Sequence, residues 1–217
     1  MTNTIPAATM LVVFDVDSTL IEQEVIEMLA AKAGKAQDVA DVTERAMRGE
    51  LDFSSSLRAR VATLKGMPVS ILEEVLEEIR ITKGAIELIQ HIHAQGGKAA
   101  AVSGGFIELL EPLSRKLNLD FIRANTLETQ DGFFTGDVIE PIIDKPAKAH
   151  ALSEWAEELG LALDRTVAVG DGANDLDMMA IAGVSIGFNA KPRVRDAADH
   201  CIDSGNLLDA VNLLPKN

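Results

Sequence analysis

Four short runs of apolar residues constrain the fold more than any other feature of this sequence. They lie at residues 10–14, 98–102, 166–169 and 184–188, and a segment of helical pattern precedes each of the last three. Continuous apolar runs of this length are typical of strands that are buried on both faces of a parallel sheet. The alternation of strands and helices therefore predicts an open α/β sheet, with helices on both faces and ligands at the carboxyl ends of its strands.

Two segments interrupt this alternation. About 80 residues separate the first two strands, far more than a crossover helix needs. Residues 22–78 have the pattern of several helices, so we expect a helical cap at 21–79, inserted after the first strand of a core formed by residues 1–20 and 80–217. Residues 121–139 alternate between apolar and polar around Asp131-Gly132, which predicts a small β-hairpin.

The composition excludes several classes of protein. Of the 217 residues, 47% are hydrophobic and 25% are charged, as in an ordinary globular fold and unlike a disordered or fibrous chain. Acidic residues outnumber basic ones by 34 to 20, and the resulting net charge of −14 argues against nucleic acid as a partner. An acidic protein that handles a phosphorylated substrate needs a local cation, so the charge balance points to a metal.

The sequence also indicates where the protein is located. Cys201 is the only cysteine, so an intrachain disulfide is excluded, and we expect this thiol to be buried and inert in a cytoplasmic protein. No basic residue precedes Lys32, and Pro6 interrupts the apolar start, so we expect no secretory signal. No uncharged run reaches the roughly 18 residues of a membrane span. The oligomeric state stays open.

Asp15 and Asp17 follow the first predicted strand in the segment Asp-Val-Asp-Ser-Thr. Residues i and i+2 of an extended chain point to the same side, so both carboxylates are expected to face one site. Such a pair can divide catalysis, one as nucleophile or metal ligand and the other as general acid and base. Aspartate is also frequent in turns, so the pair alone leaves both interpretations open. Leu20 excludes a calcium loop of the EF-hand type, which requires glycine at that position.

A second acidic segment, Gly-Asp-Gly-Ala-Asn-Asp at residues 170–175, ends the third predicted strand and begins a helix. A plain helix cap is one interpretation, because Asp and Asn favour first turns. A dinucleotide-binding loop is excluded because Asp175 stands where its third glycine is required. Two acidic strand ends side by side suit a hard, oxygen-binding cation such as Mg²⁺.

Two further segments suit a phosphate group. Ser103-Gly104-Gly105 ends another strand and precedes a helix, so its hydroxyl and backbone N–H groups can hold phosphate oxygens, although an ordinary turn explains it almost as well. Lys145 and Lys148 follow Asp144 near the start of a predicted helix. A lysine is electrostatically misplaced there unless an anion lies nearby.

These four segments, in this order, resemble the haloacid dehalogenase superfamily of phosphohydrolases. The resemblance covers nearly the whole chain, and the cap segment MRGELDFSSSLRARVATLKG is similar to that of members that hydrolyse O-phospho-L-serine. It implies a Rossmann-like core with a helical cap, and an Mg²⁺-dependent phosphomonoesterase that forms an aspartyl phosphate and releases L-serine and phosphate, the last step of serine biosynthesis.

The resemblance also implies roles for individual residues. Asp15 would be the nucleophile, and Asp17 would protonate the serine oxygen and later deprotonate the hydrolytic water. Asp15, the backbone carbonyl of Asp17, and Asp171 would hold Mg²⁺. The groups that would contact the phosphoryl oxygens or the substrate are Ser103, Gly104, Lys148 and Asn174. Asp175 would orient Lys148 or the water shell of the metal, and the spacing to Asp171 favours Lys148 over Lys145 as the motif lysine.

Specificity is expected in the cap, where the resemblance places Glu24, Met47, Phe53 and Arg60 as substrate contacts. Glu24 can pair with an ammonium, and Arg60 can grip a carboxylate bidentately. A solvated helix face around Arg60 and an ordinary apolar interior around Met47 and Phe53 are the alternatives. A phosphatase for another small ester, such as phosphohomoserine, stays open, whereas the cap and Asp17 argue against a receiver-type signalling domain.

Overall fold

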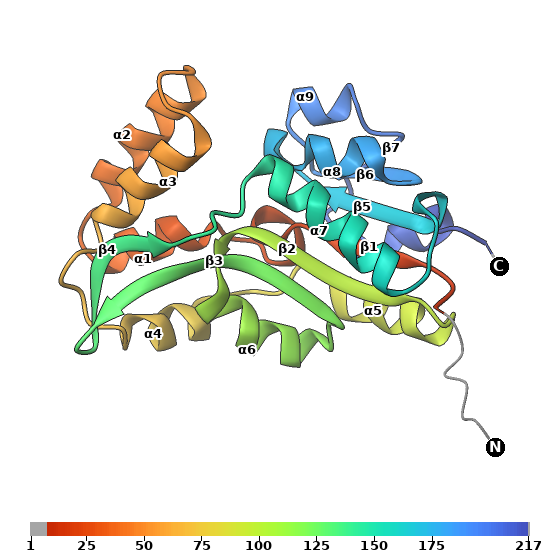
Figure 1. Cartoon of the computed structure of the whole chain (residues 1–217), viewed down its shortest axis with the longest axis horizontal. Helices are drawn as coiled ribbons and strands as arrows, with labels where there is room; N and C mark the ends of the chain where they lie inside the picture. The colour runs from red at the N-terminus through yellow and green to blue at the C-terminus, as the bar shows by residue number, and fades with distance from the viewer. Residues whose placement is uncertain (1–7, 217) are drawn as a thin grey trace.

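A seven-stranded sheet forms the centre of the computed structural model, which describes residues 8–216 (Figure 1). The strand order is β4-β3-β2-β1-β5-β6-β7, and every neighbouring pair is parallel except β3 and β4, which are antiparallel. The strands span Leu11–Phe14 (β1), Lys98–Phe106 (β2), Phe121–Gln130 (β3), Phe133–Ile139 (β4), Thr166–Gly170 (β5), Val184–Phe188 (β6) and His200–Ile202 (β7).

Helices cover both faces of this sheet. They span Val25–Lys32 (α1), Ala36–Met47 (α2), Phe53–Ala62 (α3), Ile71–Glu78 (α4), Ala85–Ala94 (α5), Ile107–Leu117 (α6), Lys145–Glu158 (α7), Leu176–Ile181 (α8) and Pro192–Arg195 (α9). Leu11 and Val13 of β1 pack in one apolar cluster with α7, α8 and α9, whereas Val12 and Phe14 pack in the other with α5 and α6. Successive side chains of a strand point to opposite faces, so a run of apolar residues fills both clusters.

The four predicted strands and the predicted hairpin are confirmed, and the fold is the expected α/β fold with helices on both faces. The hairpin is β3-β4, and it extends past the end of the core in Figure 1. Two features differ from the expectation. Strand β3 also joins the parallel sheet beside β2, and a seventh strand, β7, closes the far edge of the sheet.

The segment between β1 and β2 contains helices α1 to α5. The loop between α3 and α4 joins the hairpin through backbone hydrogen bonds: Gly66 N–H donates to Phe134 O at 2.9 Å, and Phe134 N–H donates to Met67 O at 2.9 Å. Arg58 of α3 forms ion pairs with Asp137 and Glu140, at the end of the hairpin. The segment between β1 and β2 therefore contacts the hairpin as well as the rest of the sheet.

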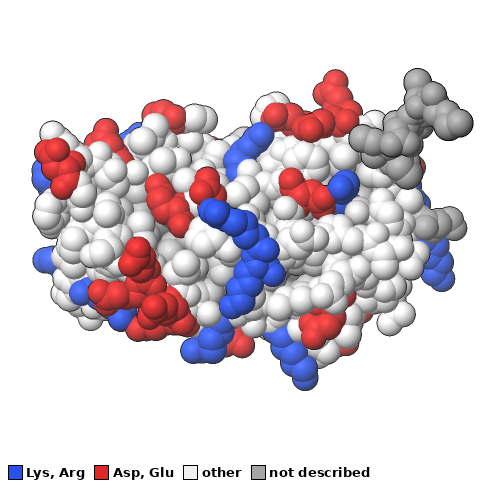
Figure 2. All heavy atoms as spheres, turned by 90° about the horizontal axis from the view of Figure 1, so that it is seen from below, with Lys and Arg blue, Asp and Glu red and all other residues white. Residues whose placement is uncertain are grey.

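The surface corrects one expectation. Cys201 is exposed and not buried, and it lies in the three-residue edge strand β7. Figure 2 shows the face on which α4, α5 and α6 lie, where acidic side chains stand beside the basic ones. Across residues 8–216, none of the helices combines the length and the apolar character that crossing a membrane requires.

Candidate active site

The carboxyl ends of β1, β2 and β5 meet at one cavity of about 560 Å³. Strand β1 lies between β2 and β5, so the residues that follow or end these strands become neighbours although they are far apart in sequence. Asp15, Ser103 and Asp171 enter the cavity in this way. The opposite wall comes from the segment between β1 and β2, and it includes Glu24, which precedes α1, and Arg60 of α3.

The turn after β1 explains why both early aspartates face the cavity. Asp15 and Asp17 have extended backbone angles, with φ of −68° and −65°, and both residues line the cavity. Ser18 then has a φ of +57°, in the left-handed region, and this sharp turn leads the chain toward α1. The pair therefore lies at the edge of the sheet and faces the cap.

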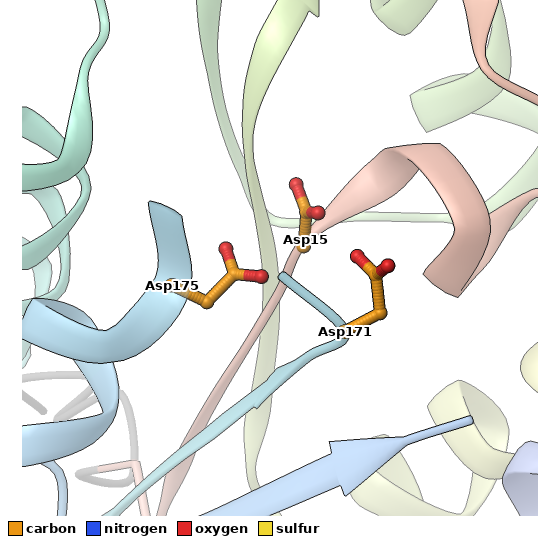
Figure 3. A group of neighbouring side chains, drawn as sticks. All are labelled: Asp15, Asp171 and Asp175. Carbon is orange, nitrogen blue, oxygen red and sulfur yellow. The ribbon is translucent and has the colours of Figure 1, made fainter. Parts of the chain in front are cut away.

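Three buried carboxylates converge at the ends of β1 and β5 (Figure 3). One oxygen each from Asp15, Asp171 and Asp175 lies within 4.8 Å of the others. We call these three residues the acid cluster. Buried oxygen ligands of this kind are what a hard divalent cation prefers, and a cation offsets the repulsion among the carboxylates. The acid cluster therefore fits a divalent metal ion such as Mg²⁺.

Glycines make this approach possible. A Cβ atom on Gly170 would lie 2.4 Å from Asp175 Oδ2, and one on Gly172 would lie 2.4 Å from Asn174 Oδ1. At Gly170 the contact extends to Asp175 Cβ at 2.8 Å, so a side chain there would displace Asp175 itself, whereas a side chain at Gly172 would displace the Asn174 amide. The Gly172 N–H also donates to Asp175 Oδ2 at 3.1 Å. The segment predicted as a metal-binding loop therefore has a local structural reason for each of its glycines.

Lys148 lies behind the acid cluster and is fully buried. Its ammonium donates to Asp15 Oδ1 at 2.5 Å and to Asp175 Oδ1 at 2.8 Å. An ammonium has three N–H donors, so one donor remains after these two bonds. Lys145, the alternative in the sequence, instead pairs with Asp177 at 2.7 Å on the surface of α8.

The burial of these groups shifts their protonation. Burial, followed by the repulsion of the Asp175 carboxylate, raises the pKa of Asp15 to about 7, although Lys148 acts in the opposite direction. For Lys148, burial alone would favour the neutral amine, but the carboxylates of Asp15 and Asp175 outweigh it and raise its pKa above the ordinary value. Lys148 is therefore a permanent cation, and Asp15 is a carboxylate that gains from any further positive charge.

Asp17 has the surroundings of a carboxylic acid that keeps its proton. Burial, and after it the nearby carboxylates of Glu24 and Asp15, raise its pKa well above the ordinary value. Its Oδ2 accepts a hydrogen bond of 3.4 Å from Val25 N–H. Its Oδ1 is shielded from solvent and has no hydrogen-bond partner among the described residues. A buried polar atom without a partner is costly, so this oxygen is placed to act on a ligand.

The end of β2 forms another part of the cavity wall. Ser103 Oγ accepts a hydrogen bond of 2.8 Å from Gly105 N–H, and Ser103 and Gly104 both line the cavity. A Cβ on Gly104 would lie 3.0 Å from the ring of Phe53, so the cap packs directly on this glycine. Buried Asn125 supports the same loop, because its Nδ2 donates to Gly104 O at 2.9 Å while its Oδ1 accepts from Ile143 N–H at 2.7 Å.

The cap contributes side chains of opposite charge to the cavity. Glu24 begins α1, and its Oε1 accepts a hydrogen bond of 2.7 Å from Ser18 Oγ. Arg60 of α3 lines the cavity with Phe53, and its Nε donates to Ser56 O at 3.3 Å. Met47 ends α2, and its side chain lies outside the part of the chain that the structure describes.

The structure adds residues that the sequence did not single out. Lys191 lines the cavity, and its Nζ lies 3.0 Å from Asp171 Oδ2. Glu27, Thr43 and Ser18 also line it, and Asn125 supports it from behind. A buried asparagine within an otherwise alternating strand was a signal for Asn125. No motif in the sequence indicates that Lys191 lies beside Asp171. The two residues are held together by a backbone hydrogen bond of 2.9 Å, which Lys191 N–H donates to Asp171 O.

Comparisons with known proteins agree with this geometry. The family model of the haloacid dehalogenase-like hydrolases matches residues 12–180. The chain is 49% identical to the phosphoserine phosphatase of Streptococcus thermophilus, covering 94% of this chain and 95% of that protein. It is 52% identical to the phosphoserine phosphatase SerB2 of Mycobacterium tuberculosis over 94% of its own length, but it spans only half of that longer relative.

A solved structure shares the whole fold. It is described as a phospho-aspartyl intermediate analogue of phosphoserine phosphatase, is 40% identical, and superposes with a TM-score of 0.90 over 96% of this chain and 100% of that one. The chain therefore belongs to the haloacid dehalogenase-like hydrolases and, within them, to the phosphoserine phosphatases.

Proposed function

We propose that the protein hydrolyses O-phospho-L-serine to L-serine and phosphate, with Asp15 as the nucleophile and Mg²⁺ as the cofactor. The observation that carries this proposal is the division of one cavity into two ends. The core supplies Asp15, Asp17 and the Ser103 loop, whereas the cap supplies Glu24 and Arg60, one negative and one positive group. A phosphorylated amino acid offers a phosphoryl group to the first end, and an ammonium and a carboxylate to the second.

The metal would be held by Asp15, Asp171 and the backbone carbonyl of Asp17. When bound, it supplies positive charge that offsets the repulsion between the Asp15 carboxylate and a phosphate dianion. Asp175 is not needed as a ligand, because its two oxygens already accept hydrogen bonds from Lys148 and from Gly172 N–H. We assign Asp175 the role of holding Lys148 against Asp15.

In the first step, a carboxylate oxygen of Asp15 attacks phosphorus and the bond between phosphorus and the serine oxygen breaks. Asp17 gives its proton to that oxygen, so neutral serine hydroxyl leaves and an aspartyl phosphate remains. The raised pKa of Asp17 supports this role, since a general acid must carry its proton when the ester binds. The unpartnered Asp17 Oδ1 is the atom that we assign to this transfer.

In the second step, water attacks the phosphorus of the aspartyl phosphate. The Asp17 carboxylate, which lost its proton in the first step, now takes one from the water. The bond between phosphorus and the Asp15 oxygen breaks, so phosphate leaves and both aspartates return to their starting states. The same residue thus serves as acid and then as base, and the cycle needs no other proton carrier.

The phosphoryl oxygens need donors that are already in place. We assign this role to Ser103, to the backbone around Gly104, to Asn174 and to the third N–H of Lys148. Lys148 is well suited because Asp15 and Asp175 already fix its other two donors. Its side chain therefore loses little conformational entropy when a phosphoryl group binds. Its position explains how an acidic protein can hold a phosphate group.

We propose that residues 21–79 act as the cap domain and recognise the serine part of the substrate. Arg60 would grip the carboxylate, Glu24 would pair with the ammonium, and Phe53 and Met47 would complete the wall. Ser18 supports the role of Glu24, because its hydroxyl fixes Oε1 and leaves the other carboxylate oxygen for a ligand. The single cysteine and the acidic surface support a cytoplasmic enzyme with a small-molecule substrate and no nucleic-acid partner.

The test compares phosphoserine with phosphoethanolamine, which keeps the ammonium but lacks the carboxylate. We expect wild type to prefer phosphoserine strongly in kcat/KM, and Arg60→Ala to lose about 2–5 kcal/mol toward phosphoserine, the cost of truncating one partner of a buried charge pair. The same variant should change little toward phosphoethanolamine. Arg58→Ala is the matched control, because Arg58 lies on the same helix but pairs with Asp137 and Glu140 outside the cavity.

Equal rates of wild type on the two esters would show that the cap does not recognise an amino acid. A preference that survives in Arg60→Ala would exclude Arg60 as the carboxylate-binding group. In the first case a phosphatase for another small ester would replace the proposal, with the chemistry of Asp15 unchanged.

A further inference from the structure

Lys191 is a cation at the cavity that the proposed reaction does not use. Its Nζ lies 3.0 Å from Asp171 Oδ2, and its backbone N–H donates to Asp171 O at 2.9 Å. The side chain of Lys191 is 64% exposed, whereas that of Asp171 is only 9% exposed. The largely exposed side chain of Lys191 therefore reaches the acid cluster and offsets the charge of one of its carboxylates.

The two lysines of the cluster are held in different ways. Lys148 is 1% exposed and is fixed between Asp15 and Asp175, so it cannot leave without exposing a buried charge. Lys191 has one carboxylate partner among the described residues, and its stem lies at the open side of the cavity. Leaving Asp171 costs Lys191 little, because solvent can hydrate its ammonium.

The charges indicate what Lys191 does. With its three carboxylates ionised, the acid cluster carries −3, and Lys148 reduces this to −2, which equals the charge that one divalent cation neutralises. Lys191 is therefore surplus once a metal is bound. A divalent cation and an ammonium on the same carboxylate would also repel each other at close range.

We propose that Lys191 takes the place of the metal on Asp171 in the metal-free protein, and that the metal has to displace its ammonium in order to bind. This inference rests on the metal site of the proposed function, and it adds a competitor for that site. Lys191 is thus a positioning residue: it holds Asp171 toward the cluster when the metal is absent and lowers the apparent affinity for the metal.

The experiment measures Mn²⁺ binding directly, without substrate, from the electron paramagnetic resonance signal of the free ion. We expect Lys191→Met to bind Mn²⁺ about three- to fivefold more tightly than wild type, the upper range for a partly exposed ion pair. Lys191→Arg keeps the charge and should stay close to wild type. Lys145→Met is the matched control, because it removes a nearby lysine whose partner, Asp177, lies outside the acid cluster.

Unchanged or weaker Mn²⁺ binding by Lys191→Met would overturn the inference, and so would an equal gain in Lys145→Met, which would indicate a general charge effect. Mn²⁺ binding by Asp171→Asn shows whether only the inference about Lys191 fails or whether the proposed metal site fails as well. If wild type binds Mn²⁺ and Asp171→Asn does not, the metal site stands whatever Lys191 does. If wild type binds no Mn²⁺, the metal site and the inference fail together.

Discussion

Asp15→Asn should stabilise the metal-free protein while it abolishes turnover. Asn has the shape of a protonated Asp, so the variant avoids placing a negative charge in a buried site beside Asp175. Lys148 keeps its bond to Asp175 in the variant, so no buried cation is left without a partner. Stability and activity are therefore expected to change in opposite directions.

The size of the gain follows from the pKa of Asp15, which burial and then Asp175 raise from 3.8 to about 7. A difference of about three pKa units, at 1.36 kcal/mol each, corresponds to about 4 kcal/mol of folding stability. Above pH 7, a protein with an uncharged group at this position should therefore be more stable than wild type by about this amount. Between about pH 4 and pH 7 the unfolded chain releases this proton while the folded protein keeps it. Wild type therefore loses stability from this group as the pH rises, and the loss is complete above the folded pKa.

The assay is urea or thermal unfolding in the presence of EDTA at about pH 5 and about pH 8. Since Asp15→Asn has no such proton to lose, its advantage over wild type should grow by about 2–3 kcal/mol between these two pH values, or roughly 5–10 °C in Tm for a chain of this size. Asp177→Asn is the control, because Asp177 lies outside the acid cluster and pairs with Lys145.

A constant difference between variant and wild type across this pH range would refute the reasoning, as would a variant that is less stable than wild type at pH 8. Added Mg²⁺ should stabilise wild type and narrow the difference, because a ligand that binds only the folded state raises its stability. Only wild type presents the Asp15 carboxylate to the metal.

Two other predictions concern catalysis. Asp17→Asn should retain metal binding, since the proposed ligand is the backbone carbonyl of residue 17, yet it should lose most activity toward phosphoserine. An aryl phosphate needs less protonation of its leaving group, so its cleavage should be less impaired. Equal losses for both esters in a single-turnover assay would contradict the general-acid role. Removal of metal by EDTA should stop hydrolysis, and Mg²⁺ should restore it; full activity in a sample that elemental analysis shows to be metal-free would exclude a catalytic metal.

The fold could be predicted where the sequence pattern is simple. Strands β1, β5 and β6 are buried on both faces, so each is a plain apolar run. Strand β3 was only partly predicted, because its alternating pattern identifies a hairpin but does not reveal that its first half pairs with β2. Strand β7 has three residues, two of them exposed, and so it carries no apolar signal.

Some residues of the candidate site could also be predicted from the sequence, and others could not. Asp15, Ser103 and Asp171 follow or end strands, so the parallel sheet alone brings them together. The spacing to Asp171 already favoured Lys148 over Lys145, and the geometry agrees, because Lys148 reaches Asp15 and Asp175 whereas Lys145 pairs with Asp177. Lys191 could not be predicted, because a loop after β6 brings it to Asp171 through main-chain hydrogen bonding, which does not depend on the side chain.

The hairpin β3-β4 supports the wall of the cavity that α3 supplies. Three backbone hydrogen bonds join it to the loop between α3 and α4, the third from Val69 N–H to Gly132 O at 3.0 Å. A Cβ on Gly136 would lie 2.9 Å from Lys65 Cβ and 3.4 Å from Ala62 Cα, so the end of α3 and the loop after it rest directly on β4. Phe53 and Arg60, which α3 supplies to the cavity wall, are therefore held in place by the hairpin as well as by their own helix.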